Sequence, residues 1–213
     1  MEMSRHNFRP IAWPKWGASL CALIAVVATA LWTSCDSGDD SEAGLDKYFL
    51  RDVAAMQAAG LPVYWLGTGF TVDGQVFRGP YVAEFGAQVE GGGIDMTYQA
   101  LLPDGGAVPL ELVVYSRAAW ELVKDRTVNP GLAGVTRRAV SVGGREGELL
   151  FLPLGTRPLN VLRLVLDLDD VVVVGEARSV IGATPSAGTD LNPIINNPDL
   201  LIQVMDNLRS YPQ

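Results

Sequence analysis

The chain has 213 residues, of which 48% are hydrophobic and 19% charged, and its formal net charge is −8. This apolar content excludes an intrinsically disordered chain, and the length suffices for one domain with a substantial core plus accessory segments. The negative charge is concentrated from Cys35 onward, where 13 basic residues face 23 acidic ones. So acidic a domain lacks the clustered Lys and Arg that phosphate backbones and anionic lipid surfaces require, and we expect no nucleic-acid partner.

The first 34 residues have the layout of an export signal. Arg5, Arg9 and Lys15 precede an uncharged apolar run over residues 16–34, WGASLCALIAVVATALWTS. A basic segment followed by an apolar one is typical of a signal peptide. An apolar run of this length also approaches the roughly 20 residues that a membrane-spanning helix needs. A cleaved signal and an uncleaved anchor therefore both stay open, and both place the domain outside the cytoplasmic membrane.

The apolar run closes on LWTSC, residues 31–35, where two small residues stand directly before a cysteine. Thr33, Ser34 and Cys35 resemble the lipobox of bacterial lipoproteins, with Trp32 in the place where leucine is usual. The resemblance implies that Cys35 is linked to diacylglycerol through a thioether, with cleavage between Ser34 and Cys35. Membrane lipid is then the partner of Cys35, and two or three acyl chains give stable attachment to the cell membrane.

The remaining leader and tether residues complete this organisation. Cys21 lies inside the apolar run and does not compete as an acylation site, so an acylated mature chain has no disulfide. Residues 36–44, DSGDDSEAG, are small and acidic and predict a solvated tether. We expect an export or lipoprotein signal over residues 1–34, an acidic flexible tether over 35–45 and a single extracytoplasmic domain over 46–213.

Helical patterns occur at three places in the domain. Asp46 is expected to cap a helix over residues 47–59, and Ser116 one that runs to Arg126. Asn197 is expected to cap the last helix, with Pro198 at its first position.

Alternating apolar residues between these helices predict strands that pair as hairpins. The segment 94–102 and the segment 108–116 form the clearest pair, because every second residue of each is apolar. Further strands are expected over 62–67, 81–89, 137–142, 146–153 and 160–177, the last one folded on a turn near Asp169 and Asp170. The turns are too short for parallel crossovers. The chain is therefore predicted to be α+β, with an antiparallel sheet built from hairpins and packed on one face by about three helices. A hairpin followed by a helix occurs twice, which leaves a weak internal repeat as an open alternative.

The segments LPVYWLG, VVVVGEA and LLIQVMDNLRSY resemble parts of extracytoplasmic domains of bacterial lipoproteins and anti-sigma-type membrane proteins. The similarity spans most of residues 61–211 and contains no motif of known chemistry. It implies a compact sensory or accessory domain and carries over no catalytic residue.

The residue inventory restricts the chemistry further. The only histidine is His6, in the leader, so the domain has no imidazole for Ser-His-Asp or Cys-His catalysis or for an ordinary zinc or copper site. Neither a phosphate-binding P-loop nor a Ser-x-x-Lys motif occurs. We expect no catalytic residue, no metal site and no cofactor, and the ligand, a protein or a small molecule, stays open.

Three groups of side chains leave other functions open. Carboxylates can support glycoside hydrolysis, and the available ones are Glu84, Glu90, Asp95, Glu111 and Glu121. Aromatic residues either line a groove or fill the core, namely Tyr64, Trp65, Tyr98, Tyr115 and Trp120. The only concentration of basic residues is Arg137, Arg138 and Arg145, and residues 167–170, DLDD, favour a hairpin turn over a calcium loop.

The sequence thus favours a membrane-anchored extracytoplasmic lipoprotein with a non-enzymatic binding or accessory domain. One alternative is a single-pass, signal-anchored sensor whose cytoplasmic signalling part a partner would supply. The other is a carboxylate-based hydrolase that acts on cell-wall polysaccharide.

Overall fold

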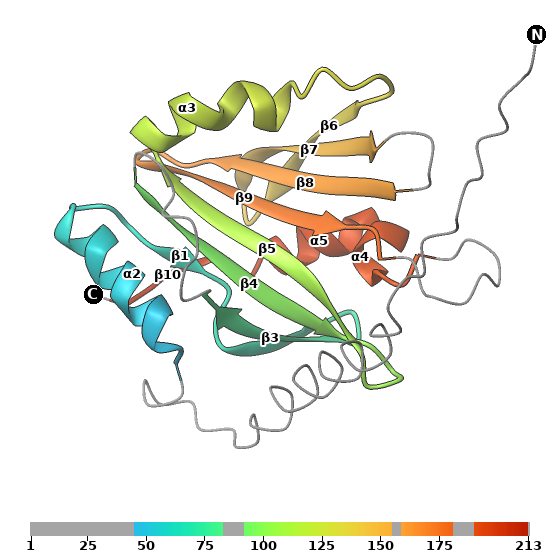
Figure 1. Ribbon diagram of the computed structural model, residues 1–213, viewed down its shortest axis with the longest axis horizontal. Helices are drawn as coiled ribbons and strands as arrows, with labels where there is room; N and C mark the ends of the chain where they lie inside the picture. The colour runs from blue at the N-terminus through green and yellow to red at the C-terminus, as the bar shows by residue number, and fades with distance from the viewer. Residues whose placement is uncertain (1–44, 83–91, 155–158, 181–189, 213) are drawn as a thin grey trace, which may run out of the picture. The chain divides into compact units, whose positions relative to one another are not determined.

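A computed structural model describes residues 45–82, 92–154, 159–180 and 190–212. These residues form an α+β fold, as predicted, with an eight-stranded antiparallel sheet and a second sheet of two strands (Figure 1). The helices are α2 (Lys47–Ala58), α3 (Arg117–Val128), α4 (Pro193–Asn196) and α5 (Pro198–Met205). The strands are β1 (Tyr64–Trp65), β2 (Gly69–Val72), β3 (Gln75–Tyr81), β4 (Gly93–Leu101), β5 (Ala107–Ser116), β6 (Thr136–Val142), β7 (Arg145–Leu154), β8 (Leu159–Asp167), β9 (Val171–Arg178) and β10 (Arg209–Ser210).

The large sheet has the strand order β2-β3-β4-β5-β9-β8-β7-β6. Each predicted hairpin forms as an antiparallel pair, and β4 and β5 keep one register over nine residue pairs. Asp169 and Asp170 lie in the β8–β9 turn, which Leu168 and Val171 close through reciprocal backbone hydrogen bonds. The alternation in β4 and β5 predicted their buried face correctly, since Met96, Tyr98 and Leu110 are fully buried.

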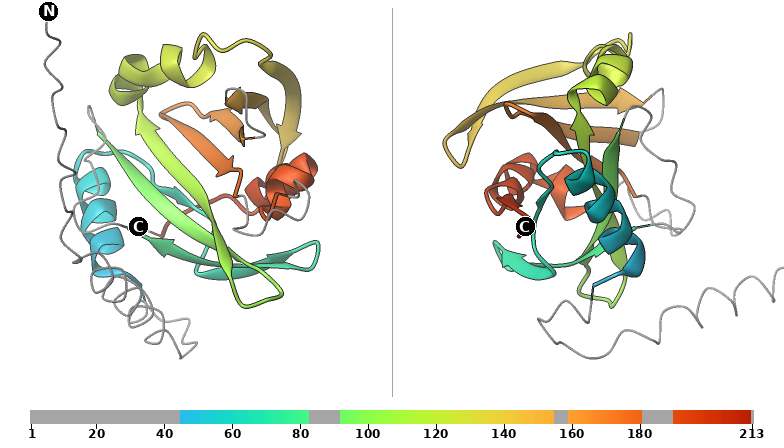
Figure 2. Two further views of the ribbon diagram at one scale, coloured as in Figure 1. Left: turned by 45° about the vertical axis from the view of Figure 1, so that its right-hand side comes forward. Right: turned by 90° about the vertical axis from the view of Figure 1, so that its left-hand side faces the viewer.

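One face of the sheet packs against α2, α4 and α5 around the larger core cluster. Helix α5 contacts both edge strands, β2 and β6, as well as β8 and β9 in the middle of the sheet. Figure 2 shows the sheet wrapping around α4 and α5. The close approach depends on Gly175 of β9, because a Cβ there would stand 3.0 Å from the sulfur of Met205. The sheet thus bends around a helix that a side chain on β9 would displace.

Helix α3 covers part of the opposite face, where a smaller cluster of six buried residues lies on β7, β8 and β9. Ser116 caps α3 as predicted, and its hydroxyl accepts a hydrogen bond from the Ala119 amide at 3.0 Å. Tyr115 and Trp120 contact each other across the cap, with ring centroids 5.8 Å apart. Of the three predicted helices, α2 and α5 pack on the face of the larger core cluster, whereas α3 packs on the opposite face and the helix α4 was not predicted.

Several local expectations differ from the structure. The strand predicted over 62–67 is only Tyr64–Trp65, which pairs with β10 near the chain end and not with the large sheet. Asn197 makes no side-chain cap of α5; instead Asn192 caps the short helix α4, which was not predicted. The β2–β3 hairpin was not predicted, because the Gly residues of its segment mask the alternation.

Parts of the predicted organisation lie outside the described residues. These parts are the signal over 1–34, the tether over 35–44 and most of the strand over 81–89. Within the described segments, no helix is long and apolar enough to cross a membrane.

The two-stranded sheet β1–β10 joins the chain end to the core through three aromatic rings. The ring of Tyr211 lies edge-on to Trp65 and to Phe49, at centroid distances of 5.0 and 5.4 Å. The Tyr211 amide also donates to the carbonyl of Val63 at 2.8 Å. Edge-to-face rings contribute beyond their buried area, so this contact fixes the C-terminal segment.

We expect Tyr211→Ala to lower the free energy of unfolding by about 1 to 3 kcal/mol, because it removes two ring contacts and leaves Trp65 and Phe49 underpacked. Urea unfolding followed by circular dichroism measures the change. Leu122→Ala is the control, since the Leu122 side chain is 58% exposed and its truncation should change little. Equal effects of the two substitutions would contradict this role of Tyr211.

Candidate functional site

The sequence-derived candidates divide into those that the structure places and those outside the described residues. Cys35, Glu84 and Glu90 lie outside them. Glu121 is exposed on α3 and pairs with Lys124 at 2.5 Å, one turn along the helix. The remaining two, Asp95 and Glu111, lie on the same face of the large sheet, the face that α3 partly covers.

Glu111 belongs to a row of polar side chains that crosses four strands. In the register of the sheet, Thr97 of β4 pairs with Glu111 of β5, Glu111 with Glu176 of β9, and Glu176 with Arg163 of β8. Two acids directly opposite each other are unfavourable. Arg178, two residues after Glu176 on the same face, compensates: its Nε donates to Glu176 Oε1 at 2.6 Å and its Nη2 to Glu111 Oε2 at 3.2 Å.

Glu176 is the most enclosed member of the row, with a relative exposure of 7%. Its second carboxylate oxygen accepts a hydrogen bond from Nε of Arg163. Nη1 of Arg163 in turn donates to the carbonyl of Thr127, in the last turn of α3, at 2.7 Å. Both Glu176 oxygens are therefore occupied by guanidinium groups, and a buried charge is tolerated when it is paired in this way.

The sequence pointed to Glu111 but not to Glu176, Arg163 or Arg178. Glu176 follows a run of four valines in which every residue is buried, and such a run hides which positions share a face. One signal was present: Glu176 is charged and lies two residues after Val174, so it shares a face with Val172 and Val174. Arg163, which interrupts the leucines of β8, carried the same signal.

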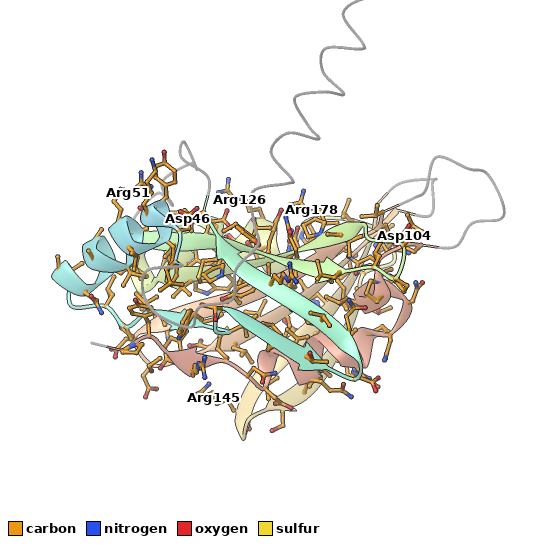
Figure 3. All side chains as sticks on the ribbon, turned by 90° about the horizontal axis from the view of Figure 1, so that it is seen from below. Asp46, Arg51, Asp104, Arg126, Arg145 and Arg178 are labelled. Carbon is orange, nitrogen blue, oxygen red and sulfur yellow. The ribbon has the colours of Figure 1, made fainter. Side chains whose placement is uncertain are left out.

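The polar residues of β4 make no bonds of this kind. Asp95, Thr97 and Gln99 point to this face at every second position, and their side chains are exposed or half-buried. Within the part of the chain that the structure describes, none of the three has a side-chain hydrogen bond or an ion pair. We use the name polar face for these three residues together with Glu111 and Arg178. Figure 3 shows Arg178 on one side of the sheet and Arg145 on the other.

The surroundings of the polar face raise the pKa values of its two carboxyl groups, Asp95 and Glu111. Partial removal of water by the surrounding protein raises the pKa of Asp95, and the charge of Glu176 raises it further, while Arg178 acts against both. Desolvation likewise raises the pKa of Glu111, and Arg178 lowers it. The Asp95 side chain is nevertheless exposed by area, so water screens much of this effect. The net result is two carboxyls whose ionisation the fold opposes mildly.

The other candidates have structural roles. Tyr98 is fully buried, and its hydroxyl accepts a hydrogen bond from the Leu66 amide at 3.0 Å. Trp65 is also buried, and Tyr115 packs with Trp120 in the smaller core cluster. Tyr64 is partly buried against the larger core cluster, so core packing accounts for the positions of these aromatic residues.

The basic residues do not form one anion site. Arg137 and Arg138 are neighbours on β6 and therefore point to opposite faces. Arg137 pairs with Glu148 at 3.2 Å, and Arg138 pairs with Asp199 of α5 at 2.5 Å. The third residue, Arg145, lies over the ring of Tyr64 at 5.6 Å.

The acidic run 167–170 is a hairpin turn, and Asp167 forms an ion pair with Arg117. In residues 45–82, 92–154, 159–180 and 190–212, no group of three or more His, Cys, Asp or Glu side chains has the arrangement of a metal site.

Comparison with known proteins does not add a family to this description. No protein-family model matches the sequence, and no curated protein matches it.

We expect Asp95→Asn to stabilise the fold slightly at pH 7. The raised pKa means that protonated Asp95 favours folding, a contribution present below the unfolded value near 3.8 and lost as the pH rises through the folded pKa. The free energy of unfolding of the variant should therefore increase relative to that of the parent as the pH rises from 3 to 7. Urea unfolding at each pH measures this difference. Glu146→Gln, an exposed carboxylate of β7, is the control and should show no such gain. A loss of stability on Asp95→Asn at pH 7 would contradict the desolvation of Asp95.

Proposed function

We propose that the protein is a membrane-anchored extracytoplasmic lipoprotein whose domain binds a ligand non-enzymatically through the polar face. The observation that carries the binding part is the set of side chains on β4. Asp95, Thr97 and Gln99 lie side by side on an interior strand with no side-chain partner among the described residues. Polar groups on an interior strand are usually satisfied by neighbours or left to water, and a regular array of them offers donors and acceptors to a ligand.

The fixed charges beside β4 support binding more than catalysis. Glu176 has both oxygens bound to arginines, and Glu111 shares Arg178. A catalytic acid or base needs a free oxygen that reaches the substrate, whereas guanidinium groups occupy both oxygens of Glu176 and one oxygen of Glu111. Glu176 and Arg163 therefore position the polar face, while Asp95 and the uncharged side chains of β4 contact the ligand.

The anchoring part rests on the leader and on its resemblance to a lipobox. It places a diacylglycerol on Cys35, with the acidic residues after it as a spacer. The acids of the spacer and the net negative charge of the domain keep the polar face away from anionic head groups.

Substitution of Cys35 by Ala tests the anchor. We expect Cys35→Ala to lose the acyl mass and the cleavage before residue 35, as seen by intact-mass analysis of the membrane fraction, because no thiol remains to accept the lipid. Cys21→Ala is the matched control and should be processed like the parent. A Cys35→Ala protein that is processed and retained in the same way as the parent would remove the proposal of a lipid anchor at Cys35.

A second candidate function has one observation in its favour. Asp95 pairs with Val113, two residues beyond Glu111 on the same strand, so Asp95 and Glu111 are diagonal neighbours on one face. Diagonal positions are roughly 7–8 Å apart in such sheets, which falls within the range of carboxylate pairs in glycoside hydrolases. The raised pKa of both groups also suits a general acid.

Purified cell-wall polysaccharide separates the two functions. For a binding protein we expect no release of soluble reducing ends on incubation, because binding alone breaks no glycosidic bond. A hydrolase would release them, and Asp95→Asn and Glu111→Gln would each lower the rate by at least about 100-fold. Glu146→Gln is the control for a general effect of charge. Release that both variants abolish would replace binding by hydrolysis as the function of the polar face.

A further inference from the structure

The two edges of the large sheet differ in how they are protected against pairing with another strand. An edge strand presents unpaired backbone N–H and C=O groups, and proteins usually shield such edges by short strands, irregularities or unpaired charges. Strand β2 is shielded by its length, since it has only four residues.

Strand β6 has no such protection. It pairs with β7 in one register over all seven residues, without a bulge. It contains no proline, and five of its residues are exposed, including Thr136 to Ala139 in succession. No backbone hydrogen bond links β6 to a further strand in the described part of the chain. Figure 2, left, shows β6 at the periphery of the sheet.

The charges of β6 are already neutralised within the chain. Arg137 pairs with Glu148 and donates to Asn129 and to the carbonyl of Val128, and Arg138 pairs with Asp199. These bonds hold both guanidinium groups over the two faces of the sheet. The backbone edge of β6 is left without the projecting charge that repels a second strand.

We propose that β6 is the interface of a homodimer, in which it pairs antiparallel with β6 of a second copy and joins the two sheets. The sequence of β6 is self-complementary in this arrangement. With Ala139 opposite Ala139 of the second copy, Arg137 faces Ser141 and Arg138 faces Val140, so no like charges are opposed. A register centred on Arg138 would oppose two arginines. Among the registers that keep the faces aligned, pairing about Ala139 uses all seven residues without repulsion.

Charged substitutions at Ser141 test this proposal, because a positive and a negative side chain there should change the dissociation constant of the dimer in opposite directions. Ser141→Lys places lysine opposite Arg137 of the second copy, twice in the dimer, and should weaken the dimer about three- to tenfold. Ser141→Glu places a carboxylate there and should strengthen it by a similar factor. Thr71→Lys on the β2 edge is the matched control and should leave the dissociation constant unchanged.

Sedimentation velocity of the full chain in density-matched detergent measures these dissociation constants. Hydrogen exchange of residues 136–142, compared between dilute and concentrated protein, locates the interface, because edge pairing slows their amides only in the dimer. A parent chain that stays monomeric at all concentrations would overturn the proposal. So would a dimer that responds equally to substitutions at Ser141 and Thr71, since that result would place the contact elsewhere.

Discussion

The packing of α5 on the middle of the sheet determines the arrangement of the other elements. The helix approaches β9 at Gly175, where a side chain would collide with Met205. From there α5 reaches both edge strands, so the sheet must bend around it. Its apolar side is buried through Leu201, Val204 and Met205. One face of the sheet is thereby filled by helices, and the other face is left to α3 and to polar side chains.

The polar row on that second face is tied to the position of α3. Arg163 binds the buried carboxylate of Glu176 and also the carbonyl of Thr127, near the C-terminal end of the helix. Carbonyls at a helix C-terminus lack helical partners and favour a nearby cation. The ion network therefore fixes the end of α3 as well as Glu111 and Glu176. The electrostatic cost of placing Glu111 opposite Glu176 is partly offset by this anchoring of the helix.

The fold class and most hairpins could be predicted because local alternation determines them. Met96 and Leu110 are buried where that alternation places them, and Ser116 caps α3 as its position indicates. Contacts between distant segments could not be predicted in this way. The pairing of Trp65 with Arg209 and the bond between Arg163 and Glu176 depend on tertiary arrangement. Asp95 and Glu111 were recognisable as carboxylates on strands, but not their shared face with Arg178, because the uniform burial of β9 conceals its two faces.

The polar face and the β6 edge offer two different kinds of recognition. Strand β4 lies between β3 and β5, so its backbone groups are used within the sheet and only its side chains can bind a ligand. On β6 the charged side chains are paired within the chain, and the backbone is what remains available. Four strands separate β4 from β6 in the sheet order. In the proposed homodimer, pairing through β6 would leave the polar face accessible, and the dimer would present two of the proposed ligand sites, which would raise the avidity for a ligand that repeats along a surface.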